Sequence, residues 1–413
     1  MSAPVSDATR VRLHHLHLRE DGESWIVGRV ETGDFIAIPP VGRRALTLLP
    51  DHTVAEVRTR LRDETGDEMD VVDFVSSLVE VGFVAEVDGT EVDSAPVPRS
   101  MLAWLRPAHV RWLLHPASAL VSVAVVLAGL AVLGFRPELT PAPHDLLWSD
   151  LGAVVLLGNL AILWTLILLH EFAHLLVARA TGAPGRMSLG TRLQFLAAQT
   201  DVSGVWAAPR RARFSVYLAG IVTNLVLAAV AVLARAAGIG GRPGEVLAAV
   251  ALLSVSLIPA QFLVFMRTDL YFILQDVAGC ANLYADGSAY ARYVAGRLVG
   301  RATPDDDPSR RLPGRERLAV RSYTVVLVAG TLACLAVELL VTLPVAIAVL
   351  TSAADTALTG GTGTQLADAG ALAFATVLFA VLWSRAWWRR HGARVRRGIS
   401  RVRGSETEGG ERP

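Results

Sequence analysis

Long apolar stretches dominate the chain after residue 115 and are separated by short polar loops. They cover residues 116–135, 151–180, 214–233, 246–266, 322–350 and 366–388. As helices, all six are long enough to cross a hydrocarbon layer of about 30 Å. The sequence therefore predicts a multi-pass α-helical membrane protein with about six transmembrane helices. The hydrophobic share of 52 % is also above that of an ordinary soluble domain.

The first hundred residues have a different pattern, in which short alternating stretches come before helical ones. Alternation predicts strands at 13–18, 24–30, 34–38 and 83–87, and helical spacing predicts helices at 42–49, 53–64 and 70–80. Thr53 and Glu56 form a capping box, and Asp70 can cap the third helix. These elements predict a small N-terminal α/β winged-helix-like domain.

The change of pattern predicts four parts of the chain. They are a winged-helix-like domain at 1–95, a linker with Pro96 and Pro98 at 96–115, a six-helix domain at 116–388 and a basic tail at 389–413. A net charge of +1 and the lack of an Arg-rich recognition helix argue against nucleic acid as a partner.

The distribution of arginine predicts the orientation in the cell membrane. Arginines crowd residues 99–111, 179–213, 267–321 and 385–403, whereas 137–150 and 351–368 carry acids and no arginine. Since positive residues favour the cytoplasmic side, both termini are expected in the cytoplasm. Arg235 and Arg242, in a short loop on the opposite side, are an exception.

The strongest chemical motif is His170-Glu171-Phe172-Ala173-His174, at the end of the second apolar stretch. On a helix, residues four apart share a face, so both imidazoles can reach one zinc ion while Glu171 lies beside the water bound to it. Two histidines in a helix are also common as packing or surface residues. Ionisable residues at a membrane edge favour the functional interpretation.

A catalytic zinc site needs a third protein ligand, and Asp269 is the candidate. It follows the fourth apolar stretch, and the predicted topology brings it to the same side of the membrane as His170. Asn224, inside the third apolar stretch, needs a polar partner. It can line the same cavity or bond to a neighbouring helix. Glu338, midway along the fifth stretch, is costly in a bilayer and has no assigned role.

These residues resemble the site-2 protease family of membrane-embedded zinc metalloproteases. The resemblance covers residues 159–282 and includes the H-E-F-A-H helix, Tyr217-Leu218-Ala219-Gly220 leading to Asn224, and the late aspartate. Arg267-Thr268-Asp269 with Tyr271-Phe272-Ile273-Leu274 is similar to the peptide zinc metalloprotease subgroup of bacteriocin and modified-peptide systems. The resemblance implies that His170, His174 and Asp269 bind zinc, that Glu171 is the general base and that Asn224 holds the substrate. It also implies that residues 187–206 form a sheet-like loop that presents an extended substrate.

The N-terminal domain resembles the peptide chaperone of pyrroloquinoline quinone biosynthesis, a RiPP recognition element. The resemblance is carried by Trp25-Ile26-Val27-Gly28-Arg29, by 31–38, by 53–61 and by 73–84. In that family a peptide adds as a strand to the third strand and lies against the third helix. The implied peptide-binding residues are the exposed face of 70–80 together with Asp34, Phe35, Ile36, Ala37 and Ile38.

The sequence thus predicts a zinc metalloprotease that captures a peptide or membrane-protein substrate, including a leader peptide, and hydrolyses it near the cytoplasmic face. One alternative is a non-catalytic zinc-binding immunity or export component of a bacteriocin system. Ile221 and Leu270 favour it, since the family often has proline and glycine there. A transporter-like protein is a third class, which internal helix repeats would favour.

Overall fold

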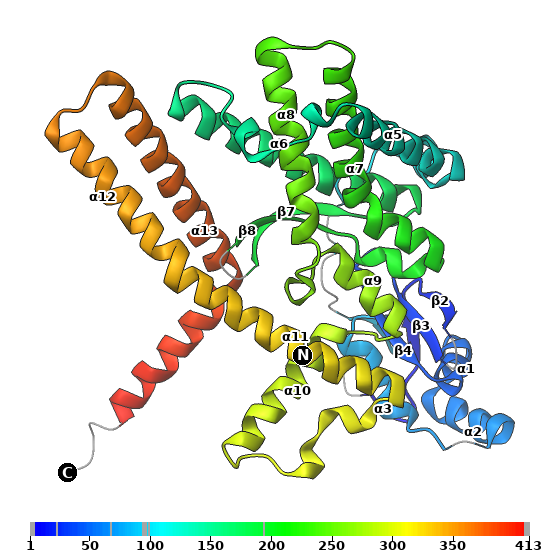
Figure 1. Cartoon of the computed structure of the whole chain (residues 1–413). Helices are drawn as coiled ribbons and strands as arrows, with labels where there is room; N and C mark the ends of the chain where they lie inside the picture. Colours follow the sequence, from blue (N-terminus) through cyan, green and yellow to red (C-terminus); the bar gives the residue numbers. More distant parts are fainter. Residues whose placement is uncertain are drawn as a thin grey trace. The chain divides into compact units, whose positions relative to one another are not determined.

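The computed structural model describes residues 5–21, 24–66, 68–92, 97, 100–192 and 195–408, without the side chains of 21, 390 and 393–408 (Figure 1). The predicted linker residues Pro96 and Pro98, and the end of the predicted basic tail, lie outside this description. The described chain is mostly helical, with small sheets.

The six helices predicted from the apolar stretches are confirmed as helices long and apolar enough to cross a membrane. They are α5 (Pro116–Phe135), α6 (Gly152–Ala180), α7 (Arg210–Ala236), α8 (Gly241–Ala260), the continuous helix Gly314–Thr359, and Gly363–Arg389 at the start of α13 (Gly363–Glu408).

The fourth of these helices differs from its prediction at both ends. It begins at Gly241, because Pro243 fits a first turn, whose N–H groups need no helical partner. It ends at Ala260 rather than at 266: Pro259 lies in its last turn, the Gln261 amide donates to the carbonyl of Ile258 at 2.9 Å, and the chain continues into the 3₁₀ turn η5 (Val264–Met266).

The fifth helix is longer than predicted and contains a π turn. It consists of α11 (Gly314–Val337), the π turn η8 (Glu338–Thr342) and α12 (Leu343–Thr359). Pro344 follows the π turn directly, and a proline ring clashes with the carbonyl four residues earlier, here that of Leu340. The wide turn therefore lets the helix continue past the proline, and it places the half-buried Glu338 at its start.

The N-terminal part contains two small antiparallel sheets. In one, β5 (Val84–Val87) lies between β1 (Val11–Leu13) and β6 (Thr90–Glu91); in the other, β3 (Ser24–Arg29) lies between β2 (His17–Asp21) and β4 (Asp34–Ile38). The predicted single strand at 13–18 is wrong, because it divides between β1 and β2. The amide of His14 donates to the carbonyl of Phe83 at 2.9 Å, so the chain leaves the first sheet only after that residue.

Three helices complete this part: α1 (Pro40–Leu48), α2 (Val54–Thr65) and α3 (Val71–Glu80). The capping box of Thr53 and Glu56 is confirmed, and the Asp70 side chain accepts a hydrogen bond from the amide of Asp73. Apolar side chains from the helices and both sheets form one core, whose fully buried members include Val27, Val54, Val57, Val71, Val75, Leu78, Phe83 and Val84. This core explains why the predicted elements assemble.

The remaining described elements are shorter. The helices are α4 (Pro107–Val110), α9 (Asp269–Ala278) and α10 (Leu283–Leu298), and the 3₁₀ turns are η1 (Arg111–Leu114), η2 (Pro137–Leu139), η3 (Pro143–Leu146), η4 (Ser203–Ala207), η6 (Pro304–Asp306) and η7 (Pro308–Arg311). The predicted sheet-like loop at 187–206 contains a two-stranded sheet of β7 (Arg186–Arg192) and β8 (Phe195–Asp201). Leu193, part of that prediction, lies outside the described residues.

The chain forms two compact units. The first comprises Met1–Ser118, His174–Arg186 and Thr200–Val216, so the N-terminal domain packs with segments from far along the sequence. The second comprises Ala119–Ala173, Met187–Gln199 and Tyr217–Pro413.

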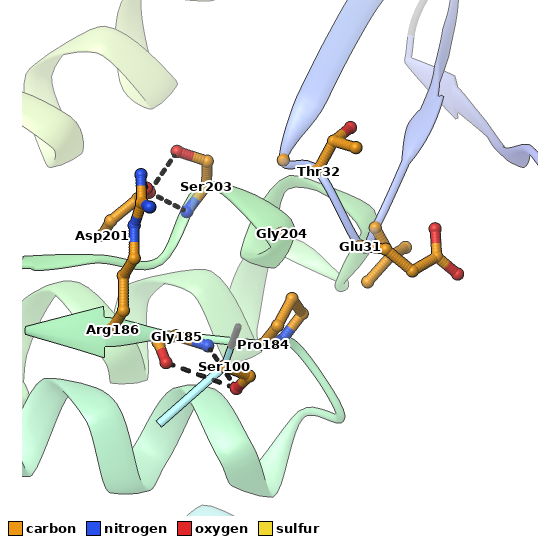
Figure 2. Close-up of a pocket in the computed structure, with 11 residues that line it drawn as sticks. Glu31, Thr32, Ser100, Pro184, Gly185, Arg186, Asp201, Ser203 and Gly204 are labelled. Carbon is orange, nitrogen blue, oxygen red and sulfur yellow. Dashed lines mark hydrogen bonds and ion pairs between the residues drawn. The ribbon is translucent and has the colours of Figure 1, made fainter. Parts of the chain in front are cut away.

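Within the first unit, the turn between β3 and β4 lies against η4. Gly33 in this turn has a φ of 77°, and a Cβ there would lie 2.7 Å from the Cβ of Ser203. Glycine is required by the backbone conformation and by the close approach. The turn lines a small cavity of about 30 Å³, whose lining side chains are drawn in Figure 2. Beside it, Asp201 accepts a hydrogen bond from the Ser203 hydroxyl at 2.7 Å. Asp201 also pairs with Arg186 at 3.4 Å, so it has a local structural role.

Candidate metal centre

Helix α6 carries both histidines of the motif on one face. They are one helical turn apart, and they are buried, with 5 % of His170 and 6 % of His174 exposed. The rest of the helix is almost entirely apolar. Burying an imidazole costs free energy unless its nitrogens form hydrogen bonds or bind a metal. Two buried histidines therefore indicate polar partners or a metal ion.

Asp269 reaches this face from a different element than predicted. It does not extend the fourth helix but opens α9, after η5 and the residue Arg267, which has a φ of 59°. Gln261, next after α8, holds the approach: its backbone carbonyl accepts from the Thr268 hydroxyl at 2.6 Å, and its side-chain oxygen accepts from the Asp269 amide at 3.2 Å. These two hydrogen bonds therefore fix the backbone position from which the Asp269 side chain extends.

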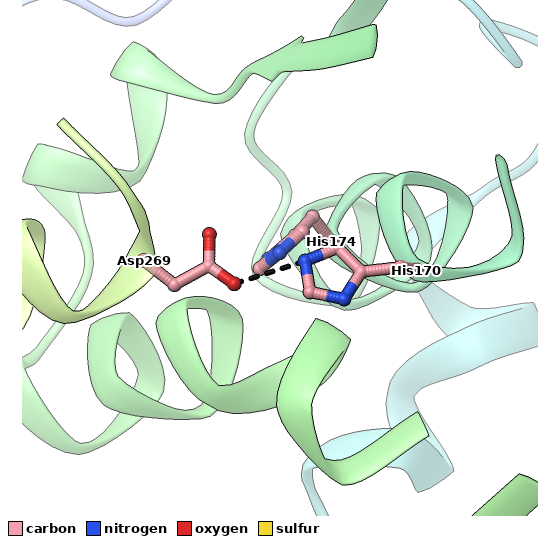
Figure 3. Close-up of side chains that lie close together, drawn as sticks. All are labelled: His170, His174 and Asp269. Atoms are coloured by element: carbon pink, nitrogen blue, oxygen red, sulfur yellow. Dashed lines mark ion pairs between the residues drawn. The ribbon is translucent and has the colours of Figure 1, made fainter. Parts of the chain in front are cut away.

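The three predicted ligands come together. Oδ2 of Asp269 lies 3.0 Å from Nε2 of His170, and one ligand atom from each of His170, His174 and Asp269 lies within 4.8 Å of the other two (Figure 3). Of the residues that the structure describes, no other His, Cys, Asp or Glu side chains form such a group. The prediction that these side chains meet is therefore confirmed.

Helix α7 supplies hydrogen-bonding partners for both imidazole rings. Nδ1 of His174 lies 2.7 Å from the carbonyl oxygen of Val216, and Nδ1 of His170 lies 3.1 Å from the side-chain nitrogen of Asn224. Val216, Gly220 and Asn224 are spaced four apart and share one face of the helix. A Cβ at Gly220 would lie 2.3 Å from the His170 ring, so glycine lets the ring lie directly against α7.

Aromatic packing fixes α9, the helix that begins at Asp269. The Tyr271 hydroxyl donates to the side-chain oxygen of Gln275 at 2.6 Å and accepts from the amide of Tyr284 at 2.9 Å. Burial raises the pKa of Tyr271 to about 12, so the phenol stays neutral and keeps this role as donor. Tyr217 of α7 stacks on Phe272, with ring centroids 5.8 Å apart.

The donor set fits a divalent metal ion such as zinc. Nitrogen and oxygen ligands about 2.0–2.1 Å from a tetrahedral zinc lie roughly 3.4 Å from each other. The 3.0 Å between His170 and Asp269 and the 4.8 Å limit for the whole group are compatible with that spacing. A backbone carbonyl can only accept, so His174 donates through Nδ1 and keeps the Nε2 lone pair for a metal. Two imidazoles and one carboxylate also leave a coordination position for water or substrate.

The other predicted site residues have separate positions. Glu171 follows His170 on α6 and is half-buried. Asn224 is fully buried on α7. Asp34, Phe35, Ile36, Ala37 and Ile38 form β4 of the N-terminal domain, at the end of the strand order β2-β3-β4, and take no part in the metal-ligand group.

Comparisons with family models, curated proteins and solved structures found no match. The resemblance to site-2 proteases and to RiPP recognition elements therefore stays a prediction. The support for a metal site is the arrangement of His170, His174 and Asp269.

Sequence reasoning missed two contributions to the metal centre. Gly220 was part of the resemblance but had no assigned role, and the carbonyl of Val216 has no signature in the sequence because every residue carries a carbonyl. The spacing of four between Val216, Gly220 and Asn224, equal to that of the histidines, is the signal that could have pointed to one shared helix face.

A second cavity, of about 570 Å³, is lined by both arginines that are exceptions to the charge pattern. Arg235 and Arg242 line it together with Asp145, Asp150 and Glu245, and Arg235 donates to the carbonyl of Leu139 at 3.3 Å. The two arginines thus lie among acids, where opposite charge favours them. None of the metal-ligand group lines this cavity.

Proposed function

We propose that this chain is a membrane-embedded zinc-dependent peptidase. It captures a ribosomal peptide, including its leader, or a membrane-protein substrate, and hydrolyses a peptide bond near the cytoplasmic face. The observation that carries this proposal is the meeting of the buried His170 and His174 with Asp269 in one group, with Glu171 next to the first ligand on the apolar helix α6.

Burial supports a catalytic rather than a surface role for these groups. Ionisable side chains in an apolar helix are costly unless they are paired or bind a metal. When bound, zinc would supply a Lewis acid that polarises the scissile carbonyl and makes water more acidic. His170, His174 and Asp269 would hold it, and α7 orients both imidazoles.

Glu171 is the residue proposed to move the proton. As a carboxylate it takes a proton from the attacking water, and it later delivers that proton to the leaving amine. The two steps balance. In the first, the water oxygen bonds to the carbonyl carbon; in the second, the carbon–nitrogen bond breaks and the amine leaves neutral with the proton from Glu171. Glu171 is adjacent to a ligand in sequence but does not belong to the ligand group, which suits a base.

The N-terminal domain is the proposed substrate-capture element. Strand β4 pairs with β3 on one side and is the last strand of its sheet, so an extended peptide can add to its other edge. Asp34 and Ala37 are exposed on β4, and Val72, Phe74 and Val79 are half-buried on α3, so apolar surface is present for peptide side chains.

The test is the change Glu171→Gln in the full-length protein purified in detergent micelles. We expect cleavage of a proteome-derived peptide library, followed by mass spectrometry of new termini, to fall about 10²-fold or more, because the general base is removed. Bound zinc, measured by elemental analysis, should stay at wild-type content. Glu245→Gln, an exposed glutamate outside the ligand group, is the matched control and should keep full activity.

Equal cleavage by the wild type and Glu171→Gln would contradict the peptidase. Absence of cleavage in both proteins, with zinc bound to both, would favour the non-catalytic immunity or export component. A wild-type protein that binds no metal would refute the metal centre as well.

A further inference from the structure

Asn224 is a fully buried polar side chain next to the metal-ligand group. None of its surface is exposed, and it lies in an apolar helix. Its side-chain nitrogen is 3.1 Å from Nδ1 of His170, whereas its side-chain oxygen has no hydrogen-bond partner among the described residues. An amide oxygen buried without a partner costs about 1–3 kcal/mol, so a position this buried needs a reason.

The ring of His170 supplies that reason. Its two nitrogens face different groups, Nε2 toward Oδ2 of Asp269 and Nδ1 toward Asn224. Nε2 can bind a metal only through its lone pair, so in the ligand tautomer the ring proton is on Nδ1. That proton needs an acceptor, and the amide of Asn224, 3.1 Å from Nδ1, can supply its oxygen.

A rotation of the amide brings this acceptor into place. The terminal torsion of asparagine is broad and roughly two-fold, so half a turn exchanges its oxygen and nitrogen with little change of shape. The oxygen gives up no other hydrogen bond, because it has none among the described residues. The resulting bond satisfies the buried oxygen and the Nδ1 proton together.

His174 shows the same arrangement on the next helical turn. Its Nδ1 faces the carbonyl of Val216, a group that can only accept. Val216 and Asn224 are two helical turns apart on α7, with Gly220 between them giving room for the His170 ring. One face of α7 therefore offers one acceptor to each histidine.

We propose that Asn224 is a positioning residue of the metal centre rather than a substrate contact. Its side-chain carbonyl accepts the Nδ1 proton of His170 and thereby holds Nε2 toward the metal. This inference rests on the proposed metal site and adds the residue that sets the tautomer of one ligand.

The experiment measures metal affinity rather than activity. Full-length protein in detergent micelles is titrated with Zn²⁺ in competition with a chelator, and the Co²⁺ absorption spectrum reports the ligand set. Asn224→Leu should bind Zn²⁺ about 10–100-fold more weakly, the usual effect of losing an outer-shell partner of a metal ligand. Asn224→Asp should stay within a few fold of the wild type, since a carboxylate accepts the same proton.

Asn159 provides the matched control. It is an asparagine in the apolar helix α6, where its oxygen accepts from the Trp148 indole at 2.9 Å and its nitrogen donates to the carbonyl of Leu146 at 2.9 Å. Asn159→Leu removes an amide from a comparable helix without touching the metal ligands. Its Zn²⁺ affinity and Co²⁺ spectrum should match the wild type.

Two results would overturn the inference. Zn²⁺ affinity of Asn224→Leu within twofold of the wild type would show that His170 does not need this partner. Affinity of Asn224→Asp as low as that of Asn224→Leu would show that packing, not proton acceptance, is required. If Asn224→Leu does not fold, Asn224→Ala takes its place with the same thresholds. A wild-type protein without metal affinity would instead refute the proposed function itself.

Discussion

Helix α7 and the continuous helix Gly314–Thr359 are similarly apolar but have different surroundings. Half of the most apolar window of α7 is buried, whereas none of the corresponding window of Gly314–Thr359 is. Hydropathy therefore indicates which segments can cross a membrane but not which of them packs inside the protein. In this molecule the buried helix is the one that contacts the metal-ligand group.

The size of the side chains accounts for the difference. Five of the ten buried positions of α7 are alanine or glycine, namely Ala219, Gly220, Ala228, Ala229 and Ala231. On Gly314–Thr359, Leu332, Leu339 and Leu340 are more than 60 % exposed. Small residues let helix backbones approach, while leucines pointing outward suit lipid. A Cβ at Gly129 of α5 would lie 2.9 Å from that of Ala229, which shows how close α5 and α7 come.

The largest expected effect distinguishes Asp269, in the metal-ligand group, from Glu338, on the helix Gly314–Thr359. Asp269→Ala removes one of three metal ligands, and we expect Zn²⁺ affinity to fall at least about 100-fold, beyond the range for outer-shell partners. Glu338→Ala, at the π turn of Gly314–Thr359, should leave affinity unchanged because Glu338 is outside the ligand group. Chelator competition measures both. Equal affinities of the two variants would rule out Asp269 as a ligand.

A smaller effect on metal affinity is expected from changing Gly220, which lies between Val216 and Asn224 on α7. In Gly220→Ala the added methyl would lie 2.3 Å from the His170 ring, so the ring must move and Zn²⁺ affinity should fall about 10–100-fold. Gly134→Ala in α5 is the control, because a Cβ there meets no atom within 4 Å. Wild-type affinity in a folded Gly220→Ala protein would show that His170 does not depend on this close approach.

The smallest expected effect concerns stability alone. Ala229→Leu inserts a large side chain where α5 and α7 meet, and overpacking of this kind costs about 1–3 kcal/mol of the free energy of unfolding. Ala336→Leu makes the same change at an exposed position of Gly314–Thr359 and should change stability by less than about 0.5 kcal/mol. Unfolding in mixed micelles with increasing denaturing detergent measures both. A greater loss in Ala336→Leu would reverse the assignment of the buried helix.

The sequence by itself determined the features that depend on neighbours within a few residues. The apolar stretches, the Thr53 capping box and the histidine pair of α6 all follow from helical spacing over one to several turns. It also placed Asp269 with the histidines, because topology restricts which loop ends can meet. The prediction from sequence was wrong where a strand partner far along the chain determines the structure. Residues 13–18, for example, divide between two sheets.

The tertiary structure alone decided how the metal ligands are oriented. The carbonyl of Val216 faces His174, and the buried amide of Asn224 faces His170, only because α6 and α7 lie against each other at Gly220. Asp269 reaches the group through the left-handed residue Arg267 and the hydrogen bonds of Gln261, not along a helix. Contacts between residues that are tens of positions apart depend on packing, which local spacing does not encode.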